Sequence, residues 1–450
     1  MRVYYHTFGC KANQYDTERM RQEAEARGAE TVGDWSDAQV CVVNTCTVTN
    51  QADAAARRLV RRVRRENPGA RIVVAGCSAA LRAPEYEAME EVASVVPGHD
   101  PVAVASRLES RGLVQLGVRR PLDRSDHEPV GAELLREREG ATRGWLKVQD
   151  GCDRKCSFCA TRLARGTSRS RSPDEVVAEA RLLARTHPEL VVTGIHIGHY
   201  GRDLVPESTL ARLLARLLDE VPDVRFRLGS VEATEIDDLL LDLMTSSGGR
   251  VAPHLHMPLQ SGADPVLRRM RRWHTRGTYR RRALEIAERL PVLGLGADVI
   301  TGFPGETEED HTSTVALVEE LPFTYLHVFP FSPREGTVAA AMNERDPVPQ
   351  RVAGERSREL RERVQAKGLA YRASRAGALA EVALEGRGGS ALTGDYLRVR
   401  LAGGVPGGAG RLHRGVLGGT GDDLYIDLPR ADRSLRGEHG VASRTSGTGP

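Results

Sequence analysis

The cysteine-rich stretch Cys152-Asp-Arg-Lys-Cys156-Ser-Phe-Cys159 constrains this chain more than any other part of its sequence. Thiolates are the usual ligands of iron–sulfur clusters, and a short loop can turn three nearby sulfurs toward one cluster. Three cysteines leave the fourth iron of a [4Fe–4S] cluster without a nearby protein ligand, whereas electron carriers normally close it with a fourth cysteine. The alternative, a zinc knuckle, requires four ligands, usually from paired C-x2-C units. The spacing therefore favours an open cluster of the kind that an enzyme uses to bring a substrate onto iron.

Length and composition set limits on the rest of the chain. A chain of 450 residues is expected to form more than one domain, and 40% hydrophobic with 28% charged residues is ordinary for a soluble protein. No uninterrupted apolar run approaches a membrane span and the first residues do not form a signal peptide, so we expect a cytoplasmic protein without a membrane partner. In that compartment, seven cysteines favour metal binding or catalysis over disulfides. The net charge of +3 does not by itself indicate nucleic acid.

The cysteine stretch and its flanks resemble a known enzyme family. C-x3-C-x2-C with an aromatic residue, Phe158, before the last cysteine resembles the signature of the radical S-adenosylmethionine (SAM) superfamily, in which SAM chelates the open iron. The flanking segments Lys147-Val-Gln-Asp-Gly-Cys152 and Arg165-Gly-Thr-Ser-Arg-Ser-Arg171 resemble those of methylthiotransferases. This resemblance extends from the first residues to about residue 370. It implies that the catalytic cluster ligands are Cys152, Cys156 and Cys159.

Residues 1–118 show an alternation of strand and helix patterns. The apolar runs 40–43 and 71–75 are typical of buried parallel strands, and residues 53–65, rich in Ala and Arg, favour a helix between them. Such alternation predicts a doubly wound α/β domain, in which ligands gather outside the carboxyl ends of the strands.

Three cysteines of this domain each follow a predicted strand: Cys10 follows a strand at 3–8, Cys46 the strand at 40–43 and Cys77 the strand at 71–75. Each has Gly or Asn-Thr beside it. They can converge on one point, and glycine lets backbone approach a bulky inorganic group. Three unpaired cysteines can equally be buried apolar side chains, and the residues alone leave both interpretations open. The resemblance to methylthiotransferases implies that they bind a second [4Fe–4S] cluster. Cys41 lies within a strand between two valines, and we expect it to pack in the core.

Residues 119–140 are charged and weakly periodic, which predicts a linker before a central domain at 141–372. Strand and helix patterns then alternate six times, which predicts a parallel (β/α) barrel with its active site at the carboxyl ends of the strands. The resemblance to radical SAM enzymes implies a partial barrel of six units. The expected helices are 173–186, 209–220, 235–245 and 306–320, and the expected strands are 144–149, 190–193, 225–229, 254–257, 296–301 and 325–329.

Polar and glycine-rich segments follow the predicted barrel strands. A glycine-rich turn after a barrel strand is by itself ordinary, so each segment alone is a weak signal. Their match to methylthiotransferases, one after another, implies a SAM pocket. The candidate cofactor-binding residues are Phe158, Gly194, Ser230, Glu232, Gln260 and Ile300. The histidines of the same segments have no ligand partner at zinc spacing, and we expect them to be polar pocket or core residues; they are His196, His199, His254 and His256.

The last part of the chain shows weaker patterns. Residues 347–373 predict a long, arginine-rich helix laid along the barrel. Short strand patterns at 380–384, 396–401 and 424–428 predict a small β domain over 373–430. It resembles a degenerate form of TRAM, the small RNA-binding barrel that commonly ends methylthiotransferases, and no phosphate-neutralising surface is evident in it. The polar, Gly/Ser-rich residues 431–450 predict a disordered tail.

The sequence therefore favours an α/β enzyme with two [4Fe–4S] clusters that uses SAM. The resemblance implies that one SAM is reductively cleaved to methionine and a 5′-deoxyadenosyl radical that abstracts hydrogen from the substrate carbon. Sulfur associated with the second cluster is then inserted, and another SAM supplies the methyl group. A non-enzymatic electron carrier or redox sensor would leave the open iron and the barrel without a role. A tRNA-binding module without catalysis would require a degenerate Cys152 triad, and the triad is intact.

The segments around the N-terminal cysteines bear on the substrate. Residues 9–18, which include Lys11-Ala-Asn-Gln-Tyr15, and residues 44–53 most resemble the branch that acts on N6-threonylcarbamoyladenosine beside the tRNA anticodon. The isopentenyladenosine branch usually carries a Gln-Met-Asn type sequence after its first cysteine, and the branch acting on a ribosomal protein differs after its second. The resemblance implies a tRNA anticodon stem-loop and an electron donor such as flavodoxin or ferredoxin as partners. A sulfur donor is also required, and the sequence does not identify it.

Overall fold

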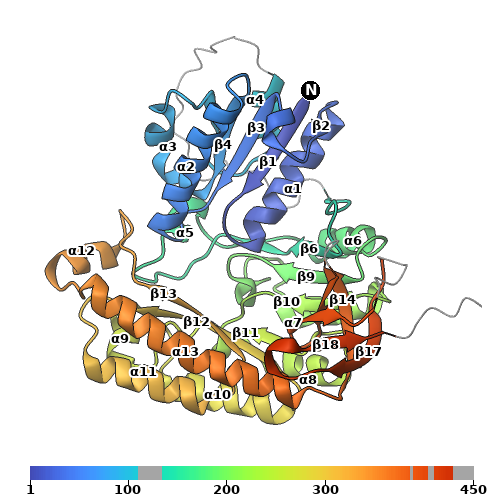
Figure 1. Cartoon of the computed structure of the whole chain (residues 1–450), viewed down its shortest axis with the longest axis vertical. Helices are drawn as coiled ribbons and strands as arrows, with labels where there is room; N and C mark the ends of the chain where they lie inside the picture. Colours follow the sequence, from blue (N-terminus) through green and yellow to red (C-terminus); the bar gives the residue numbers. More distant parts are fainter. Residues whose placement is uncertain (110–133, 386–388, 404–409, 429–450) are drawn as a thin grey trace, which may run out of the picture.

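A computed structural model describes residues 1–109, 134–385, 389–403 and 410–428. Its N-terminal part is a five-stranded parallel sheet with helices on both faces (Figure 1). The strands are β1 (Arg2–Thr7), β2 (Glu30–Thr31), β3 (Val40–Thr45), β4 (Arg71–Gly76) and β5 (Ser94–Val95), and the helices are α1 (Lys11–Ala26), α2 (Asn50–Glu66), α3 (Cys77–Glu87) and α4 (Pro101–Glu109). The strand order β2-β1-β3-β4-β5 confirms the predicted doubly wound fold.

The central strand of this sheet is buried on both faces. Val40 and Val42 of β3 point into one hydrophobic cluster, and Cys41 and Val43 point into the cluster on the opposite face. Alternate residues of a strand face opposite sides, so a continuous apolar run covers both layers of helices. Helix α2 begins three residues before the predicted position, because the Thr49 side chain caps it by accepting from the Ala52 amide at 3.2 Å.

The central part of the molecule is a partial barrel of parallel strands. They are β6 (Arg143–Lys147), β9 (Glu189–Thr193), β10 (Arg225–Leu228), β11 (His254–His256), β12 (Gly294–Thr301) and β13 (Tyr325–Pro330). They form two three-stranded sheets, β6-β9-β10 and β11-β12-β13, which a parallel bridge between Ser230 and His256 joins in sequence order. A short antiparallel pair, β7 (Gln149–Asp150) and β8 (Arg169–Ser170), lies beside the cysteine loop. This arrangement confirms the expected six-strand architecture.

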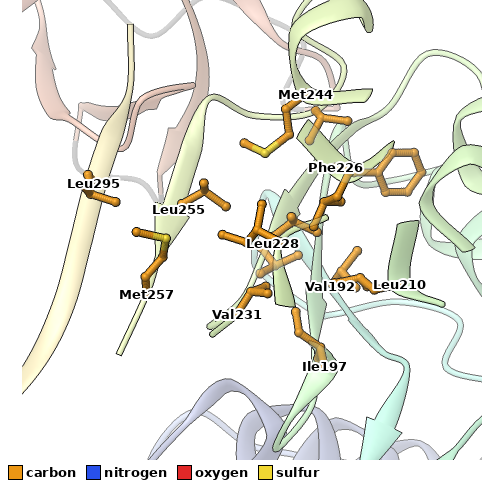
Figure 2. Close-up of a cluster of buried hydrophobic side chains, with 14 of the residues drawn as sticks. Val192, Ile197, Leu210, Phe226, Leu228, Val231, Met244, Leu255, Met257 and Leu295 are labelled. Atoms are coloured by element: carbon orange, nitrogen blue, oxygen red, sulfur yellow. The ribbon is translucent and has the colours of Figure 1, made fainter. Parts of the chain in front are cut away.

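The barrel strands bury one face against the surrounding helices. In Figure 2, Phe226, Leu228 and Leu255 meet Leu210 and Met244 in a single apolar cluster. The helices are α5 (Thr161–Arg165), α6 (Pro173–Leu183), α7 (Leu210–Glu220), α8 (Asp238–Ser246), α9 (Asp264–Arg269), α10 (Arg276–Arg289), α11 (Glu308–Glu320), α12 (Val338–Arg345) and α13 (Gln350–Ser374). The sequence patterns did not predict α5, α9, α10 and α12. The predicted arginine-rich helix is α13, which packs along β13 and α11 (Figure 1).

The opposite face of the same strands points into the lumen of the barrel. The pairing register places Arg143, Glu189 and Arg225 side by side on this face, followed by Trp145 and Arg227 one layer further along. On the other sheet it places His254, then His256 and Tyr325, then Asp298 and His327. Closed β/α barrels usually fill this space with branched apolar side chains. The lumen here is polar, which suits a polar ligand.

The C-terminal part forms a closed five-stranded barrel that packs against the start of the central strands (Figure 1). Its strands are β14 (Leu379–Glu385), β15 (Ser390–Thr393), β16 (Arg398–Leu401), β17 (His413–Gly418) and β18 (Tyr425–Asp427). Sequence patterns predicted three of them and missed β15 and β17. The predicted tail and most of the predicted linker lie outside the described residues, and the domain boundaries remain predictions. In the described part of the chain, no helix is long and apolar enough to cross a membrane.

Candidate active site

Three cysteines meet at the carboxyl edge of the N-terminal sheet. Cys10, Cys46 and Cys77 follow β1, β3 and β4; Cys10 is exposed and the other two are buried. Gly9 adopts φ +98°, and a Cβ atom there would lie only 2.7 Å from the Cys46 sulfur. Only glycine combines this backbone conformation with such a close approach. The structure therefore brings together the cysteines that the sequence placed at separate strand ends.

One buried amide, that of Asn13, ties the three cysteine segments to one another. Its Nδ2 donates to the carbonyl oxygens of Phe8 and Thr45, both at 2.9 Å. Its Oδ1 accepts from the Cys77 thiol at 3.5 Å. Sequence reasoning missed this residue, although its position one helical turn after Cys10 was the available signal.

The environment of these thiols fits a cationic metal group. Burial raises the pKa of Cys46 to about 12 and also raises the pKa of Cys77. A buried thiolate therefore needs nearby positive charge and N–H donors, and a metal supplies the strongest such charge. Donors are in place: the Val48 amide lies 3.4 Å from the Cys46 sulfur, and Arg165 Nε lies 3.2 Å from the Cys77 sulfur. This donor set fits an iron–sulfur cluster.

The second cysteine triad lies in the loop between β7 and α5. Burial raises the pKa of Cys152 to about 12 and also raises that of Cys156. His196 Nδ1 lies 3.4 Å from the Cys152 sulfur, and Arg272 Nη1 donates to the Cys156 sulfur at 3.6 Å. The three thiols of this triad are partly buried. Partly buried thiols with nearby N–H donors thus make this loop, like the first triad, suitable for an iron–sulfur cluster.

The histidine beside Cys152 has a partner that its sequence spacing concealed. His196 Nε2 lies 2.8 Å from Glu235 Oε2, and His199 Nε2 lies 3.1 Å from the other oxygen of the same carboxylate. The sequence interpretation that His196 and His199 have no ligand partner is therefore wrong, because the fold brings Glu235 to both of them. Glu235 orients the imidazole that faces the cysteine loop, which is consistent with the expected polar pocket role of His196.

Arg165, at the end of α5, connects the two triads. Besides the Cys77 sulfur, its guanidinium contacts Asn13 Oδ1 at 2.5 Å, Asp16 Oδ2 at 2.7 Å and Asp150 Oδ1 at 3.0 Å. The carbonyl of the next residue, Gly166, accepts from the Cys152 amide at 3.0 Å. Figure 1 shows α5 at the junction of the N-terminal sheet and the barrel. Both cysteine sites therefore contact the C-terminal end of one short helix.

The charges at this junction are buried and balanced. Lys147 Nζ donates to Asp16 at 2.6 Å and to Asp150 at 2.8 Å, and His99 Nε2 lies 2.8 Å from Asp150. Burial alone would raise the pKa of Asp150, but Arg165 and Lys147 hold it well below its ordinary value. Two carboxylates, a lysine and an arginine thus fix the N-terminal part on the barrel.

Helix α1 carries further residues that meet the barrel. The Tyr15 hydroxyl donates to Glu179 of α6 at 3.0 Å, and Arg171 donates to the same carboxylate at 2.8 Å. Lys11 lies one turn before Tyr15 on the same face of the helix. Burial, together with the nearby guanidinium groups of Arg143 and Arg227, lowers the pKa of Lys11 to about 8.

Gly194, one of the predicted SAM-pocket residues, lies in the turn after β9 and close to Gln149 of β7. A Cβ atom at Gly194 would lie 2.7 Å from the Gln149 carbonyl oxygen. The Gln149 side-chain oxygen accepts from the Ile195 and His196 amides at 3.1 and 2.8 Å. The turn after β9 is thereby held against the strand that leads into the Cys152 loop.

Two further candidates, Phe158 and Ile300, pack against one apolar cluster that contains Phe303 and Phe331. Gln260 adopts φ +67°, and its amide donates to the Asp298 carbonyl at 2.8 Å. These three residues form an apolar wall and a constrained backbone turn at the carboxyl side of β11 and β12. Such surroundings suit an adenine ring, although their role in SAM binding remains a prediction.

The last two candidates already have protein partners. The Ser230 hydroxyl lies 2.8 Å from His256 Nδ1, and Glu232 is ion-paired with Arg272. Burial raises the pKa of Glu232, although Arg272 opposes this effect. Arg272 also contacts Cys156, so Glu232 reaches the cysteine loop through one intervening side chain. Arg272 was not among the sequence-predicted site residues.

The fold and the cysteine sites together define a radical SAM enzyme with a second cysteine site on its N-terminal α/β part. Residues 146–318 match the Radical SAM superfamily, and residues 2–98 match "Uncharacterized protein family UPF0004". Relatives match across both regions. The chain belongs to the radical SAM methylthiotransferase family.

Two relatives illustrate the match. The threonylcarbamoyladenosine tRNA methylthiotransferase MtaB of Bacillus subtilis is 39% identical, covering 80% of this chain and 79% of the relative. The tRNA-2-methylthio-N(6)-dimethylallyladenosine synthase of Sorangium cellulosum is 33% identical, covering 98% of this chain and 93% of the relative. Among solved structures, the radical S-adenosylmethionine methyltransferase TsrM of Kitasatospora setae matches with a TM-score of 0.54 and 17% identity, over 75% of this chain and 77% of that one. This likeness shows a shared fold.

Replacing the remaining cysteine provides a control for the two sites. Cys41 is fully buried in the apolar cluster between β3 and α2, and burial raises its pKa to about 11. Cys41→Ala is expected to leave the iron content unchanged and to lower stability by about 1 kcal/mol, because it removes one buried sulfur. Iron analysis and urea unfolding of the purified variant check both points. A loss of iron would mean that Cys41 is a cluster ligand.

Proposed function

We propose that this protein is a tRNA methylthiotransferase that converts N6-threonylcarbamoyladenosine at position 37 of the anticodon loop to its 2-methylthio form. The observation that carries this proposal is the contact of both cysteine sites with the C-terminal end of α5, in a chain 39% identical to a relative named for this activity. A non-enzymatic iron–sulfur protein would leave the open iron of the Cys152 site and the barrel with its polar lumen without a role.

The cofactors of this reaction would be two [4Fe–4S] clusters and SAM. Cys152, Cys156 and Cys159 would hold the cluster whose open iron takes SAM, and Cys10, Cys46 and Cys77 would hold the other. The candidate SAM contacts are Phe158, Gly194, Ser230, Glu232, Gln260 and Ile300. When bound, these groups supply the radical, sulfur-transfer and methyl-transfer chemistry.

The chain's own residues position these groups. Arg165 fixes the Cys77 segment relative to the Cys152 loop. A fixed arrangement of this kind would let both sites act on one substrate atom. On the other side of the junction, Arg334, which follows β13, ion-pairs with Asp53 of α2 and donates to Thr47 at 2.6 Å. These buried contacts join the sheet to the barrel at two places. Exclusion of water protects reactive intermediates from side reactions.

The partners follow from the same proposal. The tRNA anticodon stem-loop would supply the substrate base, and a reductant such as flavodoxin or ferredoxin would supply electrons. The closed C-terminal barrel, β14 to β18, is the candidate RNA-docking element, since it occupies the place of the predicted TRAM-like domain. The reaction would take place in the cytoplasm, where tRNA is available.

The substrate can be tested on two anticodon stem-loops that differ only at N6 of the target adenosine. Reconstituted, reduced protein is expected to add a methylthio group to the threonylcarbamoyl RNA and to leave the isopentenyl RNA unchanged. Mass spectrometry of the digested nucleosides measures both products in one experiment.

A second candidate substrate is isopentenyladenosine, because the Sorangium cellulosum relative named for the dimethylallyl compound matches 98% of this chain. Modification of only the isopentenyl RNA would support this alternative and keep the reaction class. Activity on neither RNA, with activity on an aspartate of a ribosomal protein, would remove tRNA from the proposal.

A further inference from the structure

One lysine, Lys11, reaches the barrel lumen without a partner. It is the first residue of α1, directly follows Cys10, and is one of only four lysines in the chain. Helix α1 packs against β6 of the barrel. The charged neighbours of the Lys11 ammonium group include Arg143, Arg227 and His254, which belong to β6, β10 and β11. Those side chains line the lumen. The long side chain of Lys11 therefore extends from the N-terminal cysteine site into the barrel.

The other cations of this region already have carboxylate partners. Glu189 accepts from Arg225 at 2.6 Å and from Arg227 at 2.8 Å. Further carboxylates belong to the C-terminal barrel: Glu385 lies 2.5 Å from Arg143, and Glu381 lies 3.7 Å from Arg225. Within the described residues, Lys11 Nζ has neither a hydrogen bond nor an ion pair. None of these three carboxylates contacts the ammonium group of Lys11 directly.

Buried polar atoms on the same lumen face also lack partners. The indole Nε1 of Trp145 and the Nδ1 of His254 form no hydrogen bond with any described residue. Both side chains are at least nine-tenths buried, and the strand pairing places them on the lumen face. Buried polar groups are almost always hydrogen-bonded in folded proteins. An unpaired cation beside unsatisfied nitrogen atoms is the composition of a site for a polar, anionic ligand group.

The proposed substrate carries such a group. A threonylcarbamoyl substituent ends in the carboxylate of threonine, whereas an isopentenyl substituent is a neutral hydrocarbon. Both substituents are attached at N6, on the same ring as the carbon that receives sulfur. A base placed with that carbon near the Cys10 site would therefore bring its N6 substituent toward the residue that follows Cys10.

We propose that Lys11 binds the carboxylate of the threonylcarbamoyl group and thereby selects this substrate over adenosines with a neutral N6 substituent. The inference rests on the proposed function and adds to it the residue that recognises the substrate. An ammonium group is a compact point charge on a flexible stem, which suits a single carboxylate. Lys11 would act in recognition, and the clusters would form without it.

The test compares three anticodon stem-loops, which carry threonylcarbamoyladenosine, its carboxamide analogue without the negative charge, and isopentenyladenosine. Wild-type protein is expected to prefer the carboxylate RNA over the carboxamide by roughly 10- to 100-fold in kcat/KM, the range for a hydrogen bond to a charged group. Lys11→Gln is expected to lose that preference by lowering kcat/KM for the carboxylate RNA alone. Lys11→Arg, which keeps the charge, is expected to retain part of it.

Several outcomes of this series overturn the inference. Equal kcat/KM of wild-type protein for the carboxylate and carboxamide RNAs would overturn it. An undiminished preference of Lys11→Gln for the carboxylate RNA would also overturn it. Iron content and RNA-independent 5′-deoxyadenosine release should be unchanged in Lys11→Gln; if iron is lost, the wild-type comparison of the two RNAs decides alone. Lys367→Gln, a change on α13, is the matched control. Modification of only the isopentenyl RNA by wild-type protein would instead refute the proposed function itself.

Discussion

Replacing Cys152, Cys156 and Cys159 together with alanine is expected to abolish SAM cleavage and to halve the iron content. Six cysteines in two groups of three predict about eight irons in the wild-type protein, because each group would hold one [4Fe–4S] cluster. The two triads are held by different strands and loops, and their donors differ: Val48 and Arg165 for the first, His196 and Arg272 for the second. Loss of one triad should therefore leave the other cluster in place.

The readouts are iron analysis and the release of 5′-deoxyadenosine by reduced protein with SAM. The expected result is about four irons and no detectable 5′-deoxyadenosine. The matched variant replaces Cys10, Cys46 and Cys77 with alanine; it should also keep about half the iron, still cleave SAM, and add no sulfur to RNA. A barrel-triad variant that loses all of its iron, or none, would contradict the assignment of two separate sites.

The sequence predicted the elements and the six cysteines because these depend on local signals. Strand β3 begins with a continuous apolar run, and helix α6 begins with a Ser172–Glu175 capping box. Cys46 and Cys77 directly follow β3 and β4, and Cys10 lies shortly after β1. Elements with weaker signals were missed. Helix α10 is rich in arginine with few apolar residues. Strand β15 is short and consists mostly of small residues, and β17 is interrupted by glycine.

The contacts between distant segments could not be predicted from local patterns. Arg165 was part of a recognised motif, yet nothing in its neighbours indicates that it meets Asn13, Asp16 and Cys77 across the junction. Glu235 lies 39 residues from His196 in sequence. Buried charge networks form where the tertiary fold brings opposite charges together, and one sequence carries no periodicity that records those pairings.

Glu189 is the buried carboxylate at the base of the barrel, and its replacement is expected to have a large effect on stability. It is fully buried and accepts hydrogen bonds from Arg225 and Arg227, whose guanidinium groups also donate to the Glu381, Thr393 and Gly394 carbonyls of the C-terminal barrel. Glu189→Gln keeps the shape but removes the negative charge. Two buried guanidinium groups then lose their shared counter-charge, which should lower the free energy of unfolding by about 3–5 kcal/mol.

The pH dependence of this contribution has a definite sign. Burial opposes ionisation of Glu189, but Arg227 and Arg225 outweigh it and lower the pKa of Glu189 to about 2. An unfolded glutamate has a pKa of about 4.3. The stabilisation is therefore complete above about pH 4.3 and is lost as the pH falls toward 2. The difference in stability between wild type and Glu189→Gln should shrink over that window.

Urea unfolding of iron-free protein at pH 7, 5, 4 and 3 measures this difference without interference from acid-labile clusters. Glu319→Gln is the control, because Glu319 forms an exposed ion pair with Arg363 and exposed pairs contribute about 0–1 kcal/mol. A stability difference for Glu189→Gln that stays constant down to pH 3 would show that the lost charge is not its cause. The C-terminal barrel supplies carbonyl oxygens that accept hydrogen bonds from Arg225 and Arg227. Glu189→Gln should therefore also weaken the attachment of this barrel to the central strands. Faster proteolysis after residue 374, at the end of α13, would report that loosening directly.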